Sequence, residues 1–252
     1  MIRVVIAGFM GKLGRAAWTA VDNHPDMELV AGVDLFADKG TFDFPTFTSK
    51  EDFNIEADVW VDVTAAGHGF ENAKFALERG LAPVIGTTGF STEEIEELRR
   101  LAESKGLGGL IAPNFAVGAI LMMRFAAEAA KYLGDVEVIE LHHDGKKDAP
   151  SGTAVKTLQM MAENREPHAQ GLPGEIEEIA GSRGGDFDGM RVHSVRLPGL
   201  VAHQEVLFGG VGEGLSIRHD SYDRASFAHG ITLGINKVIE TKQFVYGLEN
   251  FM

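Results

Sequence analysis

Val4-Val-Ile-Ala7-Gly8-Phe-Met-Gly11-Lys-Leu-Gly14 predicts a buried strand, a glycine-rich turn and the first turn of a helix. This order places backbone N–H groups and the positive end of a helix where a pyrophosphate can bind. In the usual G-x-G-x-x-G pattern the middle glycine lets the backbone approach the phosphates closely, and Met10 occupies that position here. The glycines alone therefore leave an ordinary structural turn open.

Asp34 strengthens the dinucleotide interpretation. It lies 20 residues after Gly14, at the end of the second expected strand, where a carboxylate can accept both hydroxyls of a ribose. The alternative is a helix-capping or surface aspartate. Leu35 follows, not arginine, and a carboxylate repels a 2′-phosphate, so we expect NADH to be accepted readily. Lys12 or Lys39 can still contact that phosphate, which keeps NADPH open.

Residues 1–113 alternate short apolar runs with amphipathic segments, as expected for βαβ units and a parallel sheet. We therefore predict that they form a dinucleotide-binding domain. The expected strands are Ile2–Ala7, Glu28–Val33, Val59–Val63, Pro83–Ile85 and Leu107–Ile111. The expected helices are Lys12–Asn23, Phe70–Arg79 and Thr92–Ser104, the last opened by a Ser91/Glu94 capping box. The phenylalanine-rich stretch 35–53 has no clear period, and we expect a loop whose aromatic rings pack.

Two further turns follow expected strands, where open α/β sheets bind ligands. They are Gly86-Thr87-Thr88-Gly89 and Ala112-Pro113-Asn114-Phe115. Both offer small or hydrogen-bonding groups, and ordinary strand-to-helix turns are the alternative.

The second half has a different pattern. A helix is expected at Val117–Tyr132 and a strand at Val136–Leu141, and the glycine- and proline-rich stretch 165–189 is expected to be loop. Strands at Met190–Arg196, Gln204–Phe208 and Gly214–Arg218 follow without helices between them, which predicts an antiparallel or mixed sheet. A helix is expected at Ser226–Glu240. The predicted fold class is α/β, an N-terminal Rossmann-type domain with a central α+β domain of mixed sheet.

Charge and composition exclude several classes of protein. The 252 residues hold 23 Lys and Arg against 37 Asp and Glu, a net charge of −14, which argues against binding to nucleic acid or an anionic membrane. The sequence has no cysteine, so disulfides, thiolate-bound metals and a thiol nucleophile are excluded. The longest apolar run, 115–123, is too short to span a bilayer, and the first residues lack the pattern of a secretory signal. We expect a cytoplasmic protein.

The densest group of chemically active side chains is His142-His-Asp-Gly-Lys146-Lys-Asp148-Ala-Pro-Ser151-Gly-Thr153. It ends at an expected helix N-terminus, whose free N–H groups suit a carboxylate. Lysine and histidine are both candidates for general acid. A metal site is disfavoured because adjacent histidines on an extended segment point to opposite sides. Ser151 lacks the glycine pattern of a nucleophile elbow, and a solvated charged loop is the remaining alternative.

These residues resemble the dihydrodipicolinate reductase family of bacterial lysine and diaminopimelate biosynthesis, over essentially the whole chain. The matching motifs are Glu140-Leu-His142-His143-x-x-Lys146-x-Asp148-Ala-Pro-Ser151-Gly152-Thr153, Val-Ile-Gly86-Thr87-Thr88-Gly-Phe and Ala112-Pro113-Asn114-Phe115. The sequence departs from the family at Met10, where a glycine often stands, and at Leu35, where some members have an arginine that favours NADP.

The resemblance implies a reductase that transfers a hydride from NADH or NADPH to 4-hydroxy-tetrahydrodipicolinate, with loss of water, giving tetrahydrodipicolinate. It implies proton transfer by His142 and Lys146, and substrate-carboxylate contacts from His143, Gly152 and Thr153. The implied cofactor residues are Gly8, Phe9, Met10, Gly11, Lys12 and Leu13 at the pyrophosphate, Asp34 at the ribose, and Gly86, Thr87, Thr88, Ala112, Pro113, Asn114 and Phe115 near the nicotinamide. No metal is implied.

The resemblance also implies a homotetramer built by the sheet of a central domain, 114–224, and a C-terminal helix and tail, 225–252, that return to the first domain. The segments from Asn114 onward and around Tyr222–Arg224 are expected hinges. The roles of Arg183 and Arg196 are open, in the substrate site or in an interface. Two other functions remain: another two-domain NAD(P)-dependent oxidoreductase of a small acid, and a dinucleotide-binding module without turnover.

Overall fold

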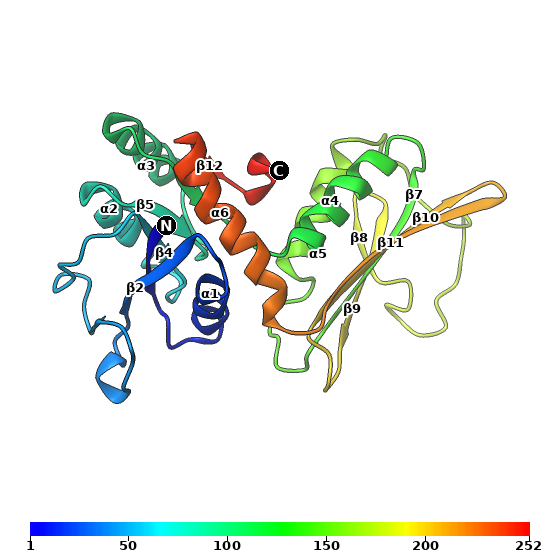
Figure 1. The fold of residues 1–252 in the computed structure, drawn as a ribbon. Helices are drawn as coiled ribbons and strands as arrows, with labels where there is room; N and C mark the ends of the chain where they lie inside the picture. Colours follow the sequence, from blue (N-terminus) through cyan, green and yellow to red (C-terminus); the bar gives the residue numbers. More distant parts are fainter. The chain divides into compact units, whose positions relative to one another are not determined.

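The computed structural model describes all 252 residues, except for the side chain of Lys39. It divides into two compact units (Figure 1). Unit 1 comprises Met1–Val117 together with Arg224–Met252, and unit 2 comprises Gly118–Asp223. Unit 2 begins later and ends earlier than the central domain, 114–224, that the sequence suggests.

Unit 1 is built on a seven-stranded sheet in which every neighbouring pair is parallel. The strand order is β3-β2-β1-β4-β5-β6-β12, which is the Rossmann order with one strand added at the far edge. The strands are β1 (Ile2–Ala7), β2 (Met27–Val33), β3 (Thr46–Phe47), β4 (Val59–Asp62), β5 (Ala82–Ile85), β6 (Gly109–Ile111) and β12 (Phe244–Tyr246).

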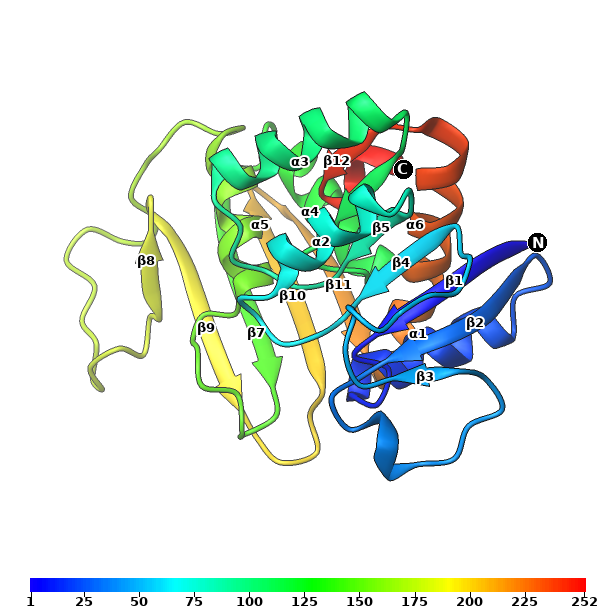
Figure 2. The same cartoon turned by 90° about the vertical axis from the view of Figure 1, so that its left-hand side faces the viewer.

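Helices cover both faces of this sheet. Helix α1 (Lys12–Asp22) packs beside α6 (Ala228–Thr241) on one face, and α2 (Gly69–Glu78) packs beside α3 (Thr92–Lys105) on the other (Figures 1 and 2). Single 3-10 turns, η1 (Ala37–Lys39), η2 (Arg224–Phe227) and η3 (Leu248–Phe251), complete the unit. Because both faces are covered, β1, β4 and β5 are near-continuous runs of buried apolar residues, which explains why the sequence shows no strict alternation there.

The predicted helices and strands of residues 1–113 are confirmed to within about two residues at each end. The capping box is also confirmed: Glu94 N–H donates to Ser91 Oγ over 3.2 Å, and Ser91 N–H donates to Glu94 Oε2 over 2.8 Å. Gly106 ends α3 at a φ of 65°, the left-handed conformation that glycine favours.

The prediction that residues 35–53 form only loop is wrong. Thr46 and Phe47 pair with Gly32 and Val33 as the edge strand β3, and Ala37–Lys39 form η1. Two residues are too few to show a period in the sequence. The packing expected of the aromatic rings is confirmed for Phe42 and Phe44, whose rings lie 5.0 to 6.0 Å from those of Phe9 and Trp18.

Unit 2 is built on a mixed five-stranded sheet, as predicted. Its order is β11-β10-β7-β9-β8, with β7 and β9 parallel and the other pairs antiparallel. The strands are β7 (Asp135–His142), β8 (Gly185–Phe187), β9 (Met190–Arg196), β10 (Ala202–Gly210) and β11 (Glu213–Ser221), and the helices are α4 (Val117–Ala129) and α5 (Gly152–Ala162).

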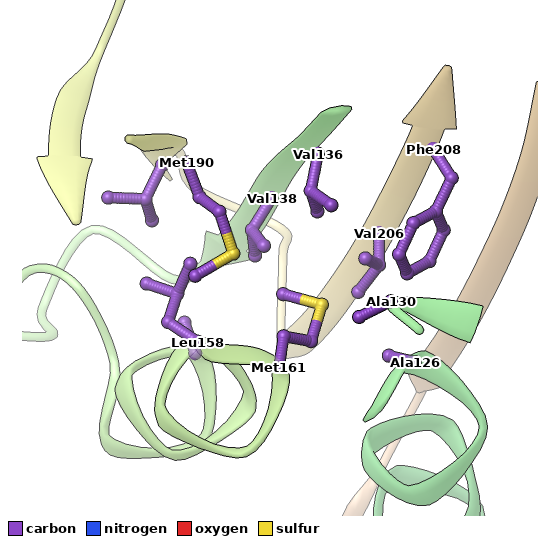
Figure 3. Packing of buried hydrophobic residues seen from close by; sticks show 11 residues of the cluster. Ala126, Ala130, Val136, Val138, Leu158, Met161, Met190, Val206 and Phe208 are labelled. Carbon is purple, nitrogen blue, oxygen red and sulfur yellow. The ribbon is translucent and has the colours of Figure 1, made fainter. Parts of the chain in front are cut away.

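The core of unit 2 lies between this sheet and its two helices. Val136 and Val138 on β7 and Val206 and Phe208 on β10 alternate with residues of the outer face (Figure 3). They contact a cluster that the helices complete through Ala126, Ala130, Leu158 and Met161. This packing fixes the helix-facing side of β7, on which Glu140 and His142 also lie.

The expectation of an uninterrupted loop at 165–189 is wrong at its end. Residues Gly185–Phe187 pair with β9 through a tight turn at Asp188 and Gly189, whose φ angles are 53° and 80°. An Asp-Gly pair between two strands is the usual sequence signal of such a hairpin. The last helix begins at Ala228, two residues after the predicted start, because Arg224–Phe227 form a 3-10 turn instead.

Candidate active site

The candidate acid–base residues lie on one loop of unit 2. This loop leaves β7 at His142 and enters α5 at Gly152. The amide N–H of Lys146 donates to the carbonyl of His143 over 3.1 Å, which turns the loop back after three residues. The structure therefore brings His142, His143, Lys146, Gly152 and Thr153 onto one connection between a strand and a helix.

The carboxylate of Glu140 lies beneath this loop and is completely buried. Arg196 on β9 donates to it from both terminal nitrogens, over 2.7 and 2.9 Å. His142 Nδ1 lies 2.5 Å from Glu140 Oε2, and the amide N–H of Ser151 donates to Oε1 over 3.2 Å. Arg196 also donates to the backbone carbonyl of Asp148 over 2.7 Å.

Burial and charge shift the titration of this cluster. Burial alone would raise the pKa of Glu140, but hydrogen bonds from Arg196, Ser194 and His142 outweigh it, and the pKa is lowered. The pKa of His142 is lowered chiefly by burial and further by the charges of Lys146 and Arg196, against the opposing effect of Glu140. The structure therefore favours an ionised Glu140 beside a neutral His142 at neutral pH.

Lys146 lies at the outer part of the loop. Its ammonium donates to both carboxylate oxygens of Asp148, over 2.8 and 2.9 Å. This pair lowers the pKa of Asp148, chiefly through the hydrogen bond from Lys146. His143 is exposed, and its ring lies beside Gly145.

The first turn of α5 has the character of an anion site. The hydroxyl of Ser151 accepts from the N–H of Ala154 over 3.2 Å, so it caps the third residue of the helix. The N–H groups of Gly152 and Thr153 precede that residue and have no carbonyl of their own helix to bind. A carboxylate can accept from them, in line with the contacts implied for these two residues.

The glycine-rich turn in unit 1 is held closely against its neighbours. Gly8 has a φ of 81°, and a Cβ there would lie 2.8 Å from the carbonyl oxygen of Val63. A Cβ on Gly14 would lie 2.1 Å from the carbonyl oxygen of Gly8. Among the described side chains none caps α1, so its first N–H groups stay available to a pyrophosphate. The side chain of Phe9 is buried in the aromatic cluster, so only its backbone can face a ligand.

Asp34 lies at the carboxyl end of β2 and ties this turn to its own loop. Its Oδ2 accepts from Met10 N–H over 3.1 Å, and its Oδ1 accepts from Phe36 N–H over 3.0 Å. Each carboxylate oxygen can accept more than one hydrogen bond, so both remain able to bind ribose hydroxyls. Leu35 beside it is 79% exposed. The side chain of Lys39 is outside the described part of the chain.

The carboxyl ends of β1, β4, β5 and β6 meet at one edge of the sheet. A Cβ on Gly86 would lie 2.9 Å from the ring of Phe115 and 3.2 Å from the side chain of Val63. Gly86 therefore provides a narrow space between two loops. Ala112 N–H donates to the carbonyl of Ile85 over 2.8 Å, which joins the two expected turns. The turns and the glycine-rich loop thus fit a dinucleotide.

Sequence reasoning assigned no definite role to four residues that the structure places at these sites. Glu140 and Arg196 hold His142, and the turn at Val63 and Thr64 contacts Gly8. The last of these could have been found, because the expected strand 59–63 ends there and the carboxyl ends of parallel strands share an edge. The first two depend on strand register, which local sequence does not show.

Within the described residues there is no group of three His, Asp or Glu side chains arranged to hold a metal ion. Among the helices of the described residues, none is long and apolar enough to cross a membrane.

Two family models match the chain end to end. The model "Dihydrodipicolinate reductase, N-terminus" matches residues 2–115, and "Dihydrodipicolinate reductase, C-terminus" matches residues 118–252. The chain belongs to the dihydrodipicolinate reductase family. Its sequence is 60% identical to the 4-hydroxy-tetrahydrodipicolinate reductase of Streptococcus pneumoniae serotype 19F, over 100% of this chain and 99% of that protein.

Solved structures agree with this membership. Dipicolinate-bound dihydrodipicolinate reductase from Paenisporosarcina sp. TG-14 is 49% identical, with a TM-score of 0.93 over 100% of both chains. GenD2 from gentamicin A biosynthesis, solved in complex with NAD, is 15% identical with a TM-score of 0.66, over 99% of this chain and 90% of its own. The second likeness shows only that the fold is shared. The family membership confirms the resemblance seen in the motifs and the oxidoreductase class.

Proposed function

We propose that this chain is a 4-hydroxy-tetrahydrodipicolinate reductase, which reduces a cyclic unsaturated dicarboxylate at the expense of NADH or NADPH and releases water. One observation carries the proposal: the loop between β7 and α5 presents an imidazole, an ammonium and a helix N-terminus together. The 60% identity to the pneumococcal reductase supports it, as does the dipicolinate in the related solved structure.

The roles follow from the chemistry of each group. Lys146 is the proton donor to the position beside the carbon that is reduced, since its ammonium contacts the partly exposed carboxylate of Asp148, which a substrate can replace. His142 shares or orients that proton transfer. The N–H groups of Gly152 and Thr153, with His143, bind a substrate carboxylate.

A reduced nicotinamide supplies the hydride when it is bound. The residues of unit 1 that hold it in this proposal are the backbone of Gly8–Leu13 at the pyrophosphate, Asp34 at the ribose, and the turns Gly86–Thr88 and Ala112–Phe115 near the nicotinamide. Asp34 favours the two free hydroxyls of NADH over a 2′-phosphate, and Lys12 offers the opposite charge near the same turn.

The proposal extends to assembly and place. Unit 1 is the dinucleotide-binding domain in this proposal, and unit 2 is the substrate and tetramerisation domain. The chain works as a homotetramer in the cytoplasm. Light scattering of the purified protein should give four times the mass of the chain, and a monomer would contradict this part alone.

A coupled assay tests the reaction. The substrate is generated enzymatically in the assay mixture, and oxidation of NADH or NADPH is followed by absorbance. We expect oxidation that depends on this substrate and is inhibited by dipicolinate. An oxidoreductase of another small acid would ignore dipicolinate, and a binding module would bind NADH without oxidising it; either result would reject the proposal.

A further inference from the structure

Several side chains beneath the loop between β7 and α5 contact one another, and the roles proposed above do not involve them. Glu140 is fully buried, yet its carboxylate accepts from Arg196, from the amide of Ser151 and from His142. A buried carboxylate persists only where its charge and lone pairs are matched. The two parallel hydrogen bonds from Arg196 provide that match.

Strand register creates this arrangement. Glu140 and His142 are two residues apart on β7, so both side chains lie on the face that carries the core. In the parallel pairing of β7 with β9, Arg196 lies opposite His142 and Ser194 lies opposite Glu140. The guanidinium therefore reaches back over one residue to the carboxylate, and the position of the imidazole is set by two strands of a rigid sheet.

The contact between Glu140 and His142 determines the tautomer of the imidazole. An ionised carboxylate can only accept a hydrogen bond, so the 2.5 Å contact requires the proton on Nδ1. In the neutral ring Nε2 is then the unprotonated nitrogen, and in the imidazolium it is the second donor. The nitrogen that faces away from Glu140 is thus the one that can exchange a proton with a ligand.

Glu140 and Arg196 also contact the far end of the loop between β7 and α5. Arg196 Nη2 donates to the carbonyl of Asp148 as well as to Glu140, and Glu140 receives the amide of Ser151. The ion pair of Glu140 and Arg196 therefore contacts both ends of the loop. His142 binds it at the start of the loop, and Asp148 and Ser151 bind it at the end. Lys146 lies between these two points.

We propose that Glu140 and Arg196 are the positioning residues of this reductase: Glu140 holds His142 in the Nδ1–H tautomer, and Arg196 holds Glu140 ionised and the loop closed. The inference rests on the proposed function for its kinetic consequence, whereas the tautomer can be measured without turnover. The charged groups that face His142 are Glu140 on its own strand, Arg196 on β9, and Lys146 on the loop.

Glu140→Gln is the sharpest test. Arg196 donates a hydrogen bond to each of the two carboxylate oxygens. In either orientation of the glutamine amide, its N–H₂ group therefore faces a hydrogen-bond donor of Arg196 and cannot accept from it. We expect kcat to fall at least tenfold with the Kd for NADH unchanged. We also expect the limb of the pH–kcat profile that reports His142 to move to lower pH, because the negative charge that favours the imidazolium is lost.

The matched control is Glu137→Gln. Glu137 lies on the other face of β7 and also contacts a histidine and an arginine, His193 at 2.9 Å and Arg183 at 2.8 Å. This substitution should leave kcat within threefold of the parent and the pH profile unmoved. A second variant, Arg196→Lys, keeps the positive charge but loses the paired hydrogen bonds, so kcat should fall while His142 remains in the Nδ1–H form.

The tautomer itself is read by ¹⁵N NMR of histidine-labelled protein, with the His142 signals assigned by their loss in His142→Gln. The parent should show the Nδ1–H form and Glu140→Gln should show a shift toward Nε2–H. An Nε2–H tautomer in the parent would overturn the inference even if no variant folds, and so would an unchanged kcat and tautomer in folded Glu140→Gln. Absence of reductase activity together with the Nδ1–H tautomer would reject the proposed function and not the positioning of His142.

Discussion

Lys146 and Asp148 form an ion pair in which one ammonium contacts both carboxylate oxygens, over 2.8 and 2.9 Å. The side chain of Asp148 is 59% exposed, whereas that of Lys146 is 21% exposed. An ion pair with so exposed a partner contributes only about 0–1 kcal/mol to stability. An anionic substrate can therefore displace Asp148 from the ammonium of Lys146 at a small cost in free energy.

Lys146→Met tests this interpretation. Removal of the ammonium should lower kcat by a factor of about 10²–10⁴, the usual contribution of a positioned proton donor, and leave the Tm nearly unchanged. The measurement is steady-state kinetics in the coupled assay beside thermal unfolding. Lys147→Met removes the same charge from the exposed neighbouring residue and should keep kcat within threefold. Equal losses in the two variants would mean that only the charge of the loop matters.

Asp34→Asn should change the choice of nucleotide. The neutral amide repels a 2′-phosphate less and binds ribose hydroxyls less strongly, since hydrogen bonds to charged groups are worth about 1.5–3 kcal/mol. We expect kcat/KM for NADH to fall roughly tenfold or more and the NADPH-to-NADH ratio to rise. Asp38→Asn, on the exposed turn η1, is the control for a nearby loss of charge. A parent preference for NADPH above about a hundredfold would contradict the role given to Asp34.

Much of unit 1 could be predicted from the sequence because its signals are local. The apolar run before Gly8 and the Ser91/Glu94 pair each act within a few residues, and each forms the element that it indicates. Strand β12 could not be predicted in this way. It pairs with β6 across more than a hundred residues, and three residues carry no readable period.

The candidate site also combines residues that local sequence indicates with residues that only strand pairing brings together. His142, Lys146 and Ser151 lie close together in the sequence, so the sequence alone indicates them as one group. Arg196 is 56 residues from Glu140, and its contact depends on the parallel register of β7 and β9. The sequence left the role of Arg196 open between a substrate site and an interface. The contact with Glu140 on which its proposed role rests is visible only once the two strands are paired.

Ser91→Ala measures the value of the capping box in α3. The substitution leaves the N–H of Glu94 without its acceptor, which typically costs about 0.5–2 kcal/mol. The Tm should fall by roughly 2–4 °C for each kcal/mol in a chain of this size. Ser104→Ala is the matched control near the other end of the helix, where the hydroxyl only donates to the carbonyl of Leu101. The control should change stability by no more than about 0.5 kcal/mol.

Asp62 provides a test of electrostatics in the core of unit 1. Its carboxylate is fully buried at the end of β4, where it accepts from Thr64 Oγ1 over 2.7 Å and from Asn72 Nδ2 over 2.6 Å. Burial raises its pKa above the ordinary value of 3.8, and the hydrogen bonds from Thr64 and Asn72 offset only part of that shift. The folded protein therefore holds the proton more tightly than the unfolded chain does.

The sign of the pH dependence follows from this shift. Stability due to Asp62 is fully present below pH 3.8 and is lost as the pH rises through the higher pKa of the folded state. Asp62→Asn removes this dependence, so the free energy of unfolding of the variant, relative to the parent, should increase between about pH 4.5 and pH 7.5. Denaturant unfolding at the two pH values measures it.

Asp58→Asn is the control with the opposite shift. Arg3 donates to this carboxylate and lowers its pKa, so its pH window lies below 3.8. The difference between Asp58→Asn and the parent should therefore stay constant over the range in which the Asp62→Asn difference grows. If the two differences changed in parallel, the pH response would belong to the chain as a whole, and the buried carboxyl of Asp62 would not be its source.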